Sequence, residues 1–323
     1  MMRRANIPAT MGSWAGSILA AMLLWLVLAL PGTVMAQSAP VVILFPEVRE
    51  PYRSVFLKIT EGIVDGLKVP STQYVVGEAE DIVALGQRLR SEQAKVVVAL
   101  GRVGLLAVQS FPPELQVVLG AALIPRESGS ASGISLTPSP EVMFGWLREL
   151  STDVKRVTVV YNQRRDEWII AKAREAAKQH GLVLNALPAE NIREAAEQYR
   201  NFFGQLKDGS EALWLPQDAG ILDENALLPT VLKEAWEKNL VVFSSNPEHV
   251  KKGVLFSLYP DNLGLGRSLA ALVQERLQAP GESPRILPLG DLLIAVNSRT
   301  AEHLGLKLSS QDKRRFNLIF PSP

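Results

Sequence analysis

Short apolar segments alternate along the chain with segments of helical periodicity, and this alternation constrains the fold more than any other feature. Several of the apolar segments are continuous runs of Val, Leu and Ile, which is typical of strands buried on both faces of a parallel sheet. The predicted strands are Val41–Phe45, Gln73–Val76, Lys95–Leu100, Gln116–Ala122, Arg156–Tyr161, Leu182–Leu187, Ala212–Leu215, Leu240–Phe243, Val254–Leu258 and Leu292–Val296. The predicted helices are Ser54–Leu67, Glu80–Ser91, Gly104–Phe111, Pro140–Glu149, Glu167–His180, Ile192–Leu206, Asn225–Lys238 and Leu263–Gln278. Strands that alternate with helices predict βαβ units in an α/β fold.

The chain breaks in places that divide this series into two lobes, and its 323 residues are enough for about two domains. Glu127–Gly133 is a small, flexible segment, and a second strand–helix series starts at Arg156. The pattern breaks again at Tyr259–Asn262 and at Ala279–Pro284. We expect a first lobe from residues 37–132 and about 260–290, and a second from 133–259 and about 291–323. Each lobe should hold a mostly parallel sheet flanked by helices, with a ligand cleft beyond the carboxyl ends of the strands.

The N-terminus has the three parts of a secretory signal peptide. Arg3 and Arg4 supply positive charge, Ile18–Leu30 is an uncharged apolar run, and Val34–Ala36 places small residues for cleavage. The run is shorter than the ~20 residues that a spanning helix needs. We expect residues 1–36 to be removed and the mature protein to be periplasmic; an uncleaved anchor is the alternative.

Composition excludes several classes of function. The chain has no Cys, which excludes disulfides, thiolate metal sites, a Cys nucleophile and a lipid-bearing N-terminal Cys. Its formal net charge of +1 gives no reason to expect a nucleic-acid partner. Its hydrophobic share of 47% and charged share of 21% are those of a globular protein.

A series of motifs along the mature chain resembles the periplasmic substrate-binding proteins of ABC transporters. The motifs are Leu213–Asp218, Leu228–Pro229, Glu234–Ala235, Val241–Ser244, Val250–Asp261, Leu263–Gly264, Ala295–Asn297, Ala301, Leu304–Leu306, and Leu147 with Arg156–Asn162. Each motif is weak alone, but their order and spacing are specific, and they cover nearly the whole mature chain. The most similar branch is often linked to uptake of aromatic or aliphatic amino acids.

The resemblance implies a two-lobed periplasmic-binding-protein fold of type I that captures a small solute by hinge closure. It implies delivery to an ABC permease in the inner membrane by a monomer, without a cofactor or a metal. The chain departs from the family in two places where ligand would lie. Ala121–Pro125 replaces the usual Asp-Pro-Val element, and Gln163–Trp168 replaces Pro-Ser and small residues. An amino-acid-like ligand that bears a carboxylate is therefore a hypothesis.

Candidate ligand contacts lie where predicted strands end. In the first lobe Gly101 lets the backbone approach a ligand, and Arg102 could bind a carboxylate, although both also suit an ordinary turn. Glu47 and Tyr52 follow the first strand. In the second lobe the candidates are Asn162, Arg164, Arg165, Trp168, Gln217, Asp218, Ser244, Ser245 and Asn246, with Asp261 at a crossing between lobes. A solvated helix start is the alternative for the arginines, and helix capping is the alternative for Asp218, Ser245 and Asn246. Arg102, Arg164 and Arg165 together predict that an anionic group is held between the lobes.

An enzyme is not expected, because no motif assembles a catalytic set. His180, His249 and His303 have the sequence context of surface residues, and no His-Glu-x-x-His motif is present. Trp214, Trp236, Phe202 and Phe203 are expected in the core. The alternative function is a periplasmic sensor that presents its ligand-bound state to a receptor or kinase, and an exported α/β enzyme ranks below it.

Overall fold

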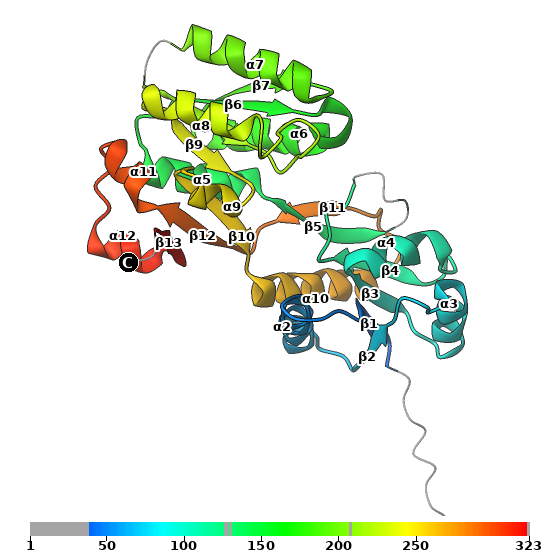
Figure 1. Cartoon of the computed structure of the whole chain (residues 1–323). Coiled ribbons are helices and arrows are strands. Elements are labelled where there is room, and N and C mark those ends of the chain that lie inside the picture. Colours follow the sequence, from blue (N-terminus) through cyan, green and yellow to red (C-terminus); the bar gives the residue numbers. More distant parts are fainter. Residues whose placement is uncertain (1–38, 126–128, 130, 207–208, 322–323) are drawn as a thin grey trace, which may run out of the picture. The chain divides into compact units, whose positions relative to one another are not determined.

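The computed structural model describes residues 39–125, 129, 131–206 and 209–321, and they build two β-sheets flanked by helices (Figure 1). The first sheet has the order β11-β5-β4-β3-β1-β2, and its pairs are parallel. Its strands are β1 (Val41–Pro46), β2 (Ser71–Val76), β3 (Val96–Leu100), β4 (Gln116–Gly120), β5 (Ser132–Pro138) and β11 (Ile286–Leu289). The expected α/β fold class is confirmed.

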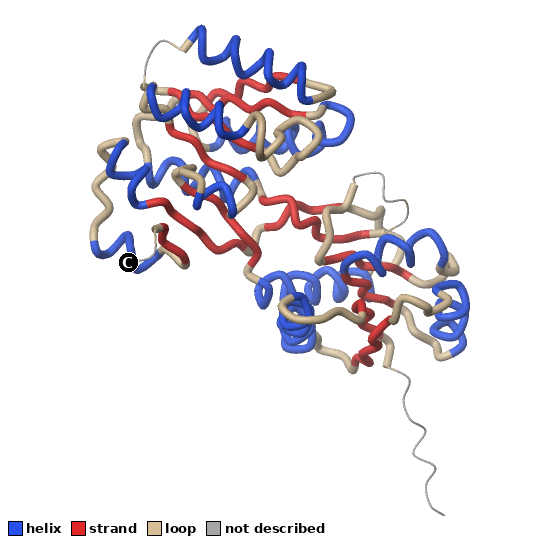
Figure 2. Tube along the Cα trace, viewed as in Figure 1, coloured by secondary structure: helices blue, strands red, loops and turns tan. Residues whose placement is uncertain are grey.

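The second sheet has the order β13-β12-β10-β9-β8-β6-β7 and is parallel except where β10 meets β12. Its strands are β6 (Arg156–Tyr161), β7 (Val183–Pro188), β8 (Glu211–Leu215), β9 (Val241–Ser244), β10 (Phe256–Pro260), β12 (Leu292–Asn297) and β13 (Leu318–Phe320). The helices are α2 (Tyr52–Gly66), α3 (Ile82–Ser91), α4 (Gly101–Ser110), α5 (Pro140–Leu150), α6 (Gln163–Gln179), α7 (Ile192–Gln205), α8 (Leu228–Glu237), α9 (Glu248–Lys251), α10 (Asn262–Gln278), α11 (Ser298–His303) and α12 (Ser310–Arg315). Figure 2 shows helices and strands alternating along the trace of both sheets.

Helices α2 and α10 pack together against the first sheet (Figure 1). Their backbones meet at Gly62 and Gly266, where an added Cβ would lie 2.2 Å from Leu263 O and 2.2 Å from Ile59 O, respectively. No larger side chain fits at that separation, so these two glycines permit the contact. The helix that follows β10 therefore returns the chain from the second sheet to the first.

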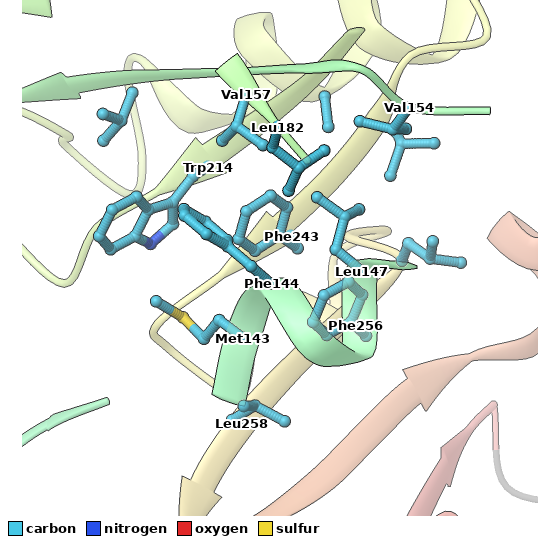
Figure 3. Packing of buried hydrophobic residues seen from close by; sticks show 14 of the residues in the cluster. Met143, Phe144, Leu147, Val154, Val157, Leu182, Trp214, Phe243, Phe256 and Leu258 are labelled. Carbon is cyan, nitrogen blue, oxygen red and sulfur yellow. The ribbon is translucent and has the colours of Figure 1, made fainter. Parts of the chain in front are cut away.

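The core of the second sheet is built on stacked aromatic rings (Figure 3). Trp214, Phe243 and Phe256 come from three neighbouring strands, with ring centroids 6.4 Å and 5.2 Å apart and nearly parallel planes. Phe144 on α5 meets Trp214 and Phe243 edge-on, at 6.1 Å and 6.2 Å. Such offset and edge contacts add to the burial of apolar area. The packing therefore fixes the position of the Trp214 ring near the end of β8, where the same ring also lines a cavity.

The chain passes between the sheets at three places: after β5, between β10 and α10, and between β11 and β12. At the second place Asp261 caps α10, because its Oδ1 accepts a hydrogen bond from Leu263 N at 3.1 Å. Its own N–H donates to Asp291 O at 2.9 Å, which ties the second passage to the third. The lobe boundaries expected from the sequence stay a prediction.

Several local expectations differ from the structure. Strands β5, β11 and β13 were not predicted; β5 begins at Ser132, inside Glu127–Gly133, which was expected to be a small, flexible segment. Helix α6 begins at Gln163 rather than Glu167, because Asn162 caps it by accepting from Arg165 N at 3.3 Å. The expectation for His249 was wrong, since its ring is buried and bonds to Ser244 Oγ at 2.8 Å.

Trp236 also differs from its expectation: it is 47% exposed and stacks on the His303 ring, whereas Trp214, Phe202 and Phe203 are buried as expected. The predicted signal peptide lies outside the described residues. Within the described part of the chain, no helix has both the length and the apolar character needed to cross a bilayer.

Candidate functional site

A cavity of about 470 Å³ lies at the carboxyl ends of strands from both sheets. Its size is within the range of small-molecule sites, and its wall is mostly apolar with a few polar groups, as such sites are. The lining residues are Leu123, Ile124, Pro125, Thr137, Pro138, Arg165, Asp166, Trp168, Ile169, Trp214, Pro216, Gln217, Asp218, Ala219 and Ser245. This is the position where open α/β sheets bind their ligands.

The first sheet contributes an uncharged part of this wall, the loop Leu123–Pro125 after β4 and the end of β5. The loop is held on β5 by two hydrogen bonds, from Ile124 N to Ser135 Oγ at 3.0 Å and from Leu136 N to Ala122 O at 2.8 Å. Ile124 is buried beneath, whereas Leu123 is 50% exposed. The loop therefore presents an apolar surface to the cavity on a fixed backbone.

The second sheet contributes the charged part of the wall. Arg165 and Asp166 lie in the first turn of α6, directly after β6, and Asp218 lies in the turn after β8. Arg165 forms an ion pair with Asp218, and its Nε lies 3.6 Å from Asp166 Oδ1. The Asp218 side chain is 1% exposed, and its Oδ1 also accepts from Gly220 N at 2.7 Å. The single guanidinium of Arg165 is therefore shared between the carboxylates of Asp166 and Asp218.

Asp166 is the less well compensated of the two acids. Oδ2 of each acid is buried without a hydrogen-bond partner among the described residues, but Asp218 Oδ2 forms the ion pair with Arg165, whereas Asp166 Oδ2 has no such contact. Burial raises the pKa of Asp166 to about 6, with Arg165 opposing that rise and the charge of Asp218 adding to it. Partial burial lowers the pKa of the Arg165 guanidinium, but the ion pairs with Asp218 and Asp166 raise it by more, so the net change is upward. Perturbed carboxyl groups in a cavity are characteristic of functional sites.

Trp214 connects the aromatic core to the cavity. It is buried, and its Nε1 donates to Ser245 Oγ at 3.0 Å. Ser245 Oγ lies 3.8 Å from Met143 Sδ, a weak acceptor on α5. Because the tryptophan ring is fixed by core packing and by this hydrogen bond, it forms a rigid back wall for the cavity.

The structure brings together five of the residues predicted for the site: Arg165, Trp168, Gln217, Asp218 and Ser245 all line the cavity. Nine do not line it: Glu47, Tyr52, Gly101, Arg102, Asn162, Arg164, Ser244, Asn246 and Asp261. Tyr52, Glu47 and Arg102 are exposed, and Arg164 pairs with Glu190 at 3.2 Å, with 82% of its side chain exposed. A ligand contact by any of the fourteen stays a prediction.

Several of the nine have structural roles in the fold. Gly101 starts α4 with a φ of +63°, and a Cβ there would lie 2.9 Å from the Phe56 ring. Asn162 and Asp261 cap helices, as described above. Asn246 Oδ1 accepts from Glu248 N at 3.1 Å in the turn before α9, whose N-cap is Pro247, so Asn246 supports the helix start without being the N-cap expected as its alternative.

Ser244, His249 and Glu224 form a polar network that has the residue types of a hydrolase triad. Ser244 Oγ lies 2.8 Å from His249 Nδ1, and His249 Nε2 lies 3.4 Å from Glu224 Oε1. Ser244 and His249 are both buried, and neither lines the cavity. Burial lowers the pKa of His249 against the attraction of Glu224. Ser244 Oγ also donates to Leu215 O at 3.1 Å, so the network connects the ends of β8 and β9 to α9. These contacts give the three residues a structural role beside the cavity.

Asp166 was not named as a candidate contact, and no candidate contact came from the first-sheet wall, although Ala121–Pro125 and Gln163–Trp168 were both expected to lie where ligand would bind. Asp166 follows a strand end, as its candidate neighbours do, so the same signal could have identified it. Leu123 and Pro138 carry no polar signal, and β5 was not recognised. Among the described residues, no group of three or more His, Asp or Glu side chains could hold a metal ion.

Two sheets of mostly parallel strands, with a cavity at their carboxyl ends, have the architecture of the type I periplasmic-binding-protein fold. The family described as "ABC transporter substrate binding protein" matches residues 56–311, and the chain belongs to this family. The family is normally periplasmic; its members bind small molecules and deliver them to a permease. The resemblance identified from the sequence motifs is therefore confirmed.

One solved structure agrees with this chain on the fold, and a second is similar at a lower score. The ligand-free, open form of a substrate-binding protein with adhesive properties from Clostridium difficile matches with a TM-score of 0.56 at 16% identity, over 88% of this chain and 99% of that one. An ABC domain from Streptococcus pneumonia in complex with L-Trp matches with a TM-score of 0.47 at 17% identity, over 87% of this chain and 100% of that one. None of the curated proteins matches significantly.

Proposed function

We propose that this protein captures a small solute in the periplasm, in the cavity at the strand ends, and delivers it to an ABC permease of the inner membrane. The observation that carries the proposal is the cavity itself, since an apolar wall from one sheet and a charged wall from the other surround a volume suited to one small ligand. The family supplies the transport context. The protein would act as a monomer and without catalysis.

Ligand capture would proceed by closure of the two lobes. The chain passes between the sheets at three places, and such a connection permits hinge motion while keeping each lobe rigid. A ligand that contacts both walls favours the closed state by its additional contacts there. The closed, loaded form would be the one that docks on the permease.

An amino-acid-like ligand suits the cavity better than a simple anion. Arg102 and Arg164, from which an anionic ligand was expected, lie outside the cavity wall, and Arg165 is already paired with Asp218. The cavity wall offers one cationic and two anionic side chains on the second sheet's side and an apolar surface on the first sheet's side. A zwitterion with an apolar side chain matches both sides.

A periplasmic sensor that presents its ligand-bound state to a receptor or kinase is the alternative function, and it would use the same cavity. A permease gene beside the gene of this protein would favour transport over sensing.

Native mass spectrometry of protein purified without refolding tests the proposal. The protein should retain a solute of small-molecule mass, and Trp168→Ala should lose it because Trp168 lines the cavity. Trp236→Ala is the matched control, since Trp236 lies outside the cavity wall and is 47% exposed. Equal solute retention by Trp168→Ala and the parent would show that the ligand binds elsewhere.

A further inference from the structure

The cavity wall has more negative than positive side chains, and this excess of negative charge indicates which charge the ligand carries. Among the lining residues, Arg165 is the one with a positive charge, whereas Asp166 and Asp218 are both acidic. Arg165 contacts both acids. With both carboxylates ionised, the empty wall has a net charge of −1.

We propose that the ligand of this cavity carries an ammonium group and does not need a carboxylate, because the wall lacks one positive charge. The inference rests on the proposed function and narrows it to a class of ligand. An ammonium placed beside Asp166 supplies the missing charge. It can also donate hydrogen bonds to the part of the Asp166 carboxylate that lines the cavity, since that side chain is 20% exposed.

A ligand whose only charge is a carboxylate is disfavoured by the groups that would have to receive it. The Arg165 guanidinium is already shared between Asp218 and Asp166, so an incoming carboxylate meets two like charges. One backbone donor at the start of α6 is also engaged, because Arg165 N donates to Asn162 Oδ1 at 3.3 Å and is not free for a ligand carboxylate.

Burial of Asp166 supports the same conclusion. Burial raises the pKa of Asp166 to about 6, and the single shared guanidinium of Arg165 opposes that rise only in part. A carboxylate kept in such a place lowers the stability of the empty state, and a ligand cation would remove that penalty. Sites that trade stability for binding in this way are common.

The body of the ligand meets apolar side chains. Trp168, Ile169 and Trp214 come from the second sheet's side, and Leu123 and Ile124 come from the first. An aromatic or branched aliphatic body of modest size fills such a cavity. A probe set should therefore keep the body constant and change the charged head alone.

Isothermal titration calorimetry of the purified protein with 2-phenylethylamine, L-phenylalanine and 3-phenylpropionate makes this comparison. The same three charged groups (amine, amino acid and carboxylic acid) on an indole ring and on an isobutyl group complete the panel of ligands. On the body that fits, the amine and the amino acid should bind, and the acid should bind at least about 100-fold more weakly. Asp166→Asn should lower amine affinity about 10- to 100-fold. Asp153→Asn, an exposed acid of the second sheet's side that lies outside the cavity wall, is the control.

Three outcomes would overturn the inference: an acid that binds as tightly as its amine, an amine affinity unchanged by Asp166→Asn, or no amine that binds on any body. If native mass spectrometry still shows a solute that Trp168→Ala loses, the proposed function stands without the ammonium requirement. If the retained solute or the panel affinities do not respond to Trp168→Ala, the site itself is wrong, and the proposed function fails with it.

Discussion

The two walls of the cavity are built in opposite ways. The second sheet's wall is continuous with a core: Trp214 is stacked on Phe243, and Asp218 is almost fully buried. The first sheet's wall is a surface loop, in which Leu123 is half exposed and hydrogen bonds to β5 fix the backbone. All the charged lining residues belong to the second sheet's side.

The difference indicates a division of roles. A wall locked into a core keeps charged groups at fixed positions, which charge recognition requires. A loop that offers apolar surface can cover a ligand without defining its orientation. We therefore expect the second sheet to bind the ligand first and the first sheet to close over it. Changes in the second wall should affect stability and affinity together, whereas changes in the first should affect affinity with little effect on stability.

The largest effect is expected from Trp214→Ala. Removing a fully buried aromatic side chain should lower the free energy of unfolding by about 3–5 kcal/mol. Urea denaturation followed by circular dichroism measures the loss. Trp236→Ala, which removes a half-exposed ring, should lose much less; equal losses would contradict the assignment of the second wall to the core.

A smaller effect of opposite sign is expected from Asp166→Asn. Because the pKa of Asp166 is raised from 3.8 to about 6 in the folded protein, its charge destabilises the fold above pH 6. The full shift corresponds to about 3 kcal/mol, and partial solvent exposure reduces it to about 1–2 kcal/mol.

The variant should therefore be more stable than the parent at pH 7.5. Its advantage should shrink as the pH falls from 6 to 4 and vanish below about 4, where the parent is protonated in both states. Paired urea titrations at pH 7.5 and pH 4 give the comparison, with Asp153→Asn as the control. An advantage that persists at pH 4, or a destabilised variant at pH 7.5, would not fit a strained carboxylate.

Leu123→Ala tests the first wall. Since the side chain is half exposed, the free energy of unfolding should fall by less than about 1 kcal/mol. Affinity for the retained solute should fall about 3- to 10-fold, as one apolar contact is lost in the closed state. Leu318→Ala, at 43% exposure and outside the cavity wall, should leave affinity unchanged. A stability loss of several kcal/mol at Leu123 would mean that this wall too is part of a core.

The smallest effect is expected from Arg164→Ala. Its ion pair with Glu190 is exposed on both sides, and such pairs contribute ~0–1 kcal/mol. Stability and affinity should both change little in calorimetry. A tenfold loss of affinity would restore the sequence-based hypothesis that Arg164 binds the ligand.

The sequence predicted the fold well because its main signal is local. Continuous apolar runs such as Val96–Leu100 mark strands that are buried on both faces, and helices fill the intervals between them. Strand β5 was not predicted because Ser132 and Gly133 suit a flexible segment as well as a strand. Its strand conformation depends on hydrogen-bonded pairing with β4 on one side and with β11 on the other, and β11 lies far away in the sequence.

The site was predicted in part, and the physical reason is similar. Polar residues at strand ends, such as Arg165 and Asp218, can be identified from the strand pattern alone. Which of two adjacent arginines faces the cavity depends on where α6 begins, and the structure places that start four residues earlier than the periodicity indicated. Leu123 was placed near the ligand only by the resemblance to the family, and Pro138 reaches the cavity through tertiary packing that no local pattern marks.

The most direct test of the account measures closure itself. The chain has no native Cys, so Val83→Cys and Val183→Cys, both at exposed positions and one on each sheet's side, allow clean spin labelling. Double electron–electron resonance then gives the distance distribution between the labels with and without the retained solute. The account predicts that saturating solute shifts the distribution to a single, narrower population. An unchanged distribution at saturation would contradict capture by closure of the two walls.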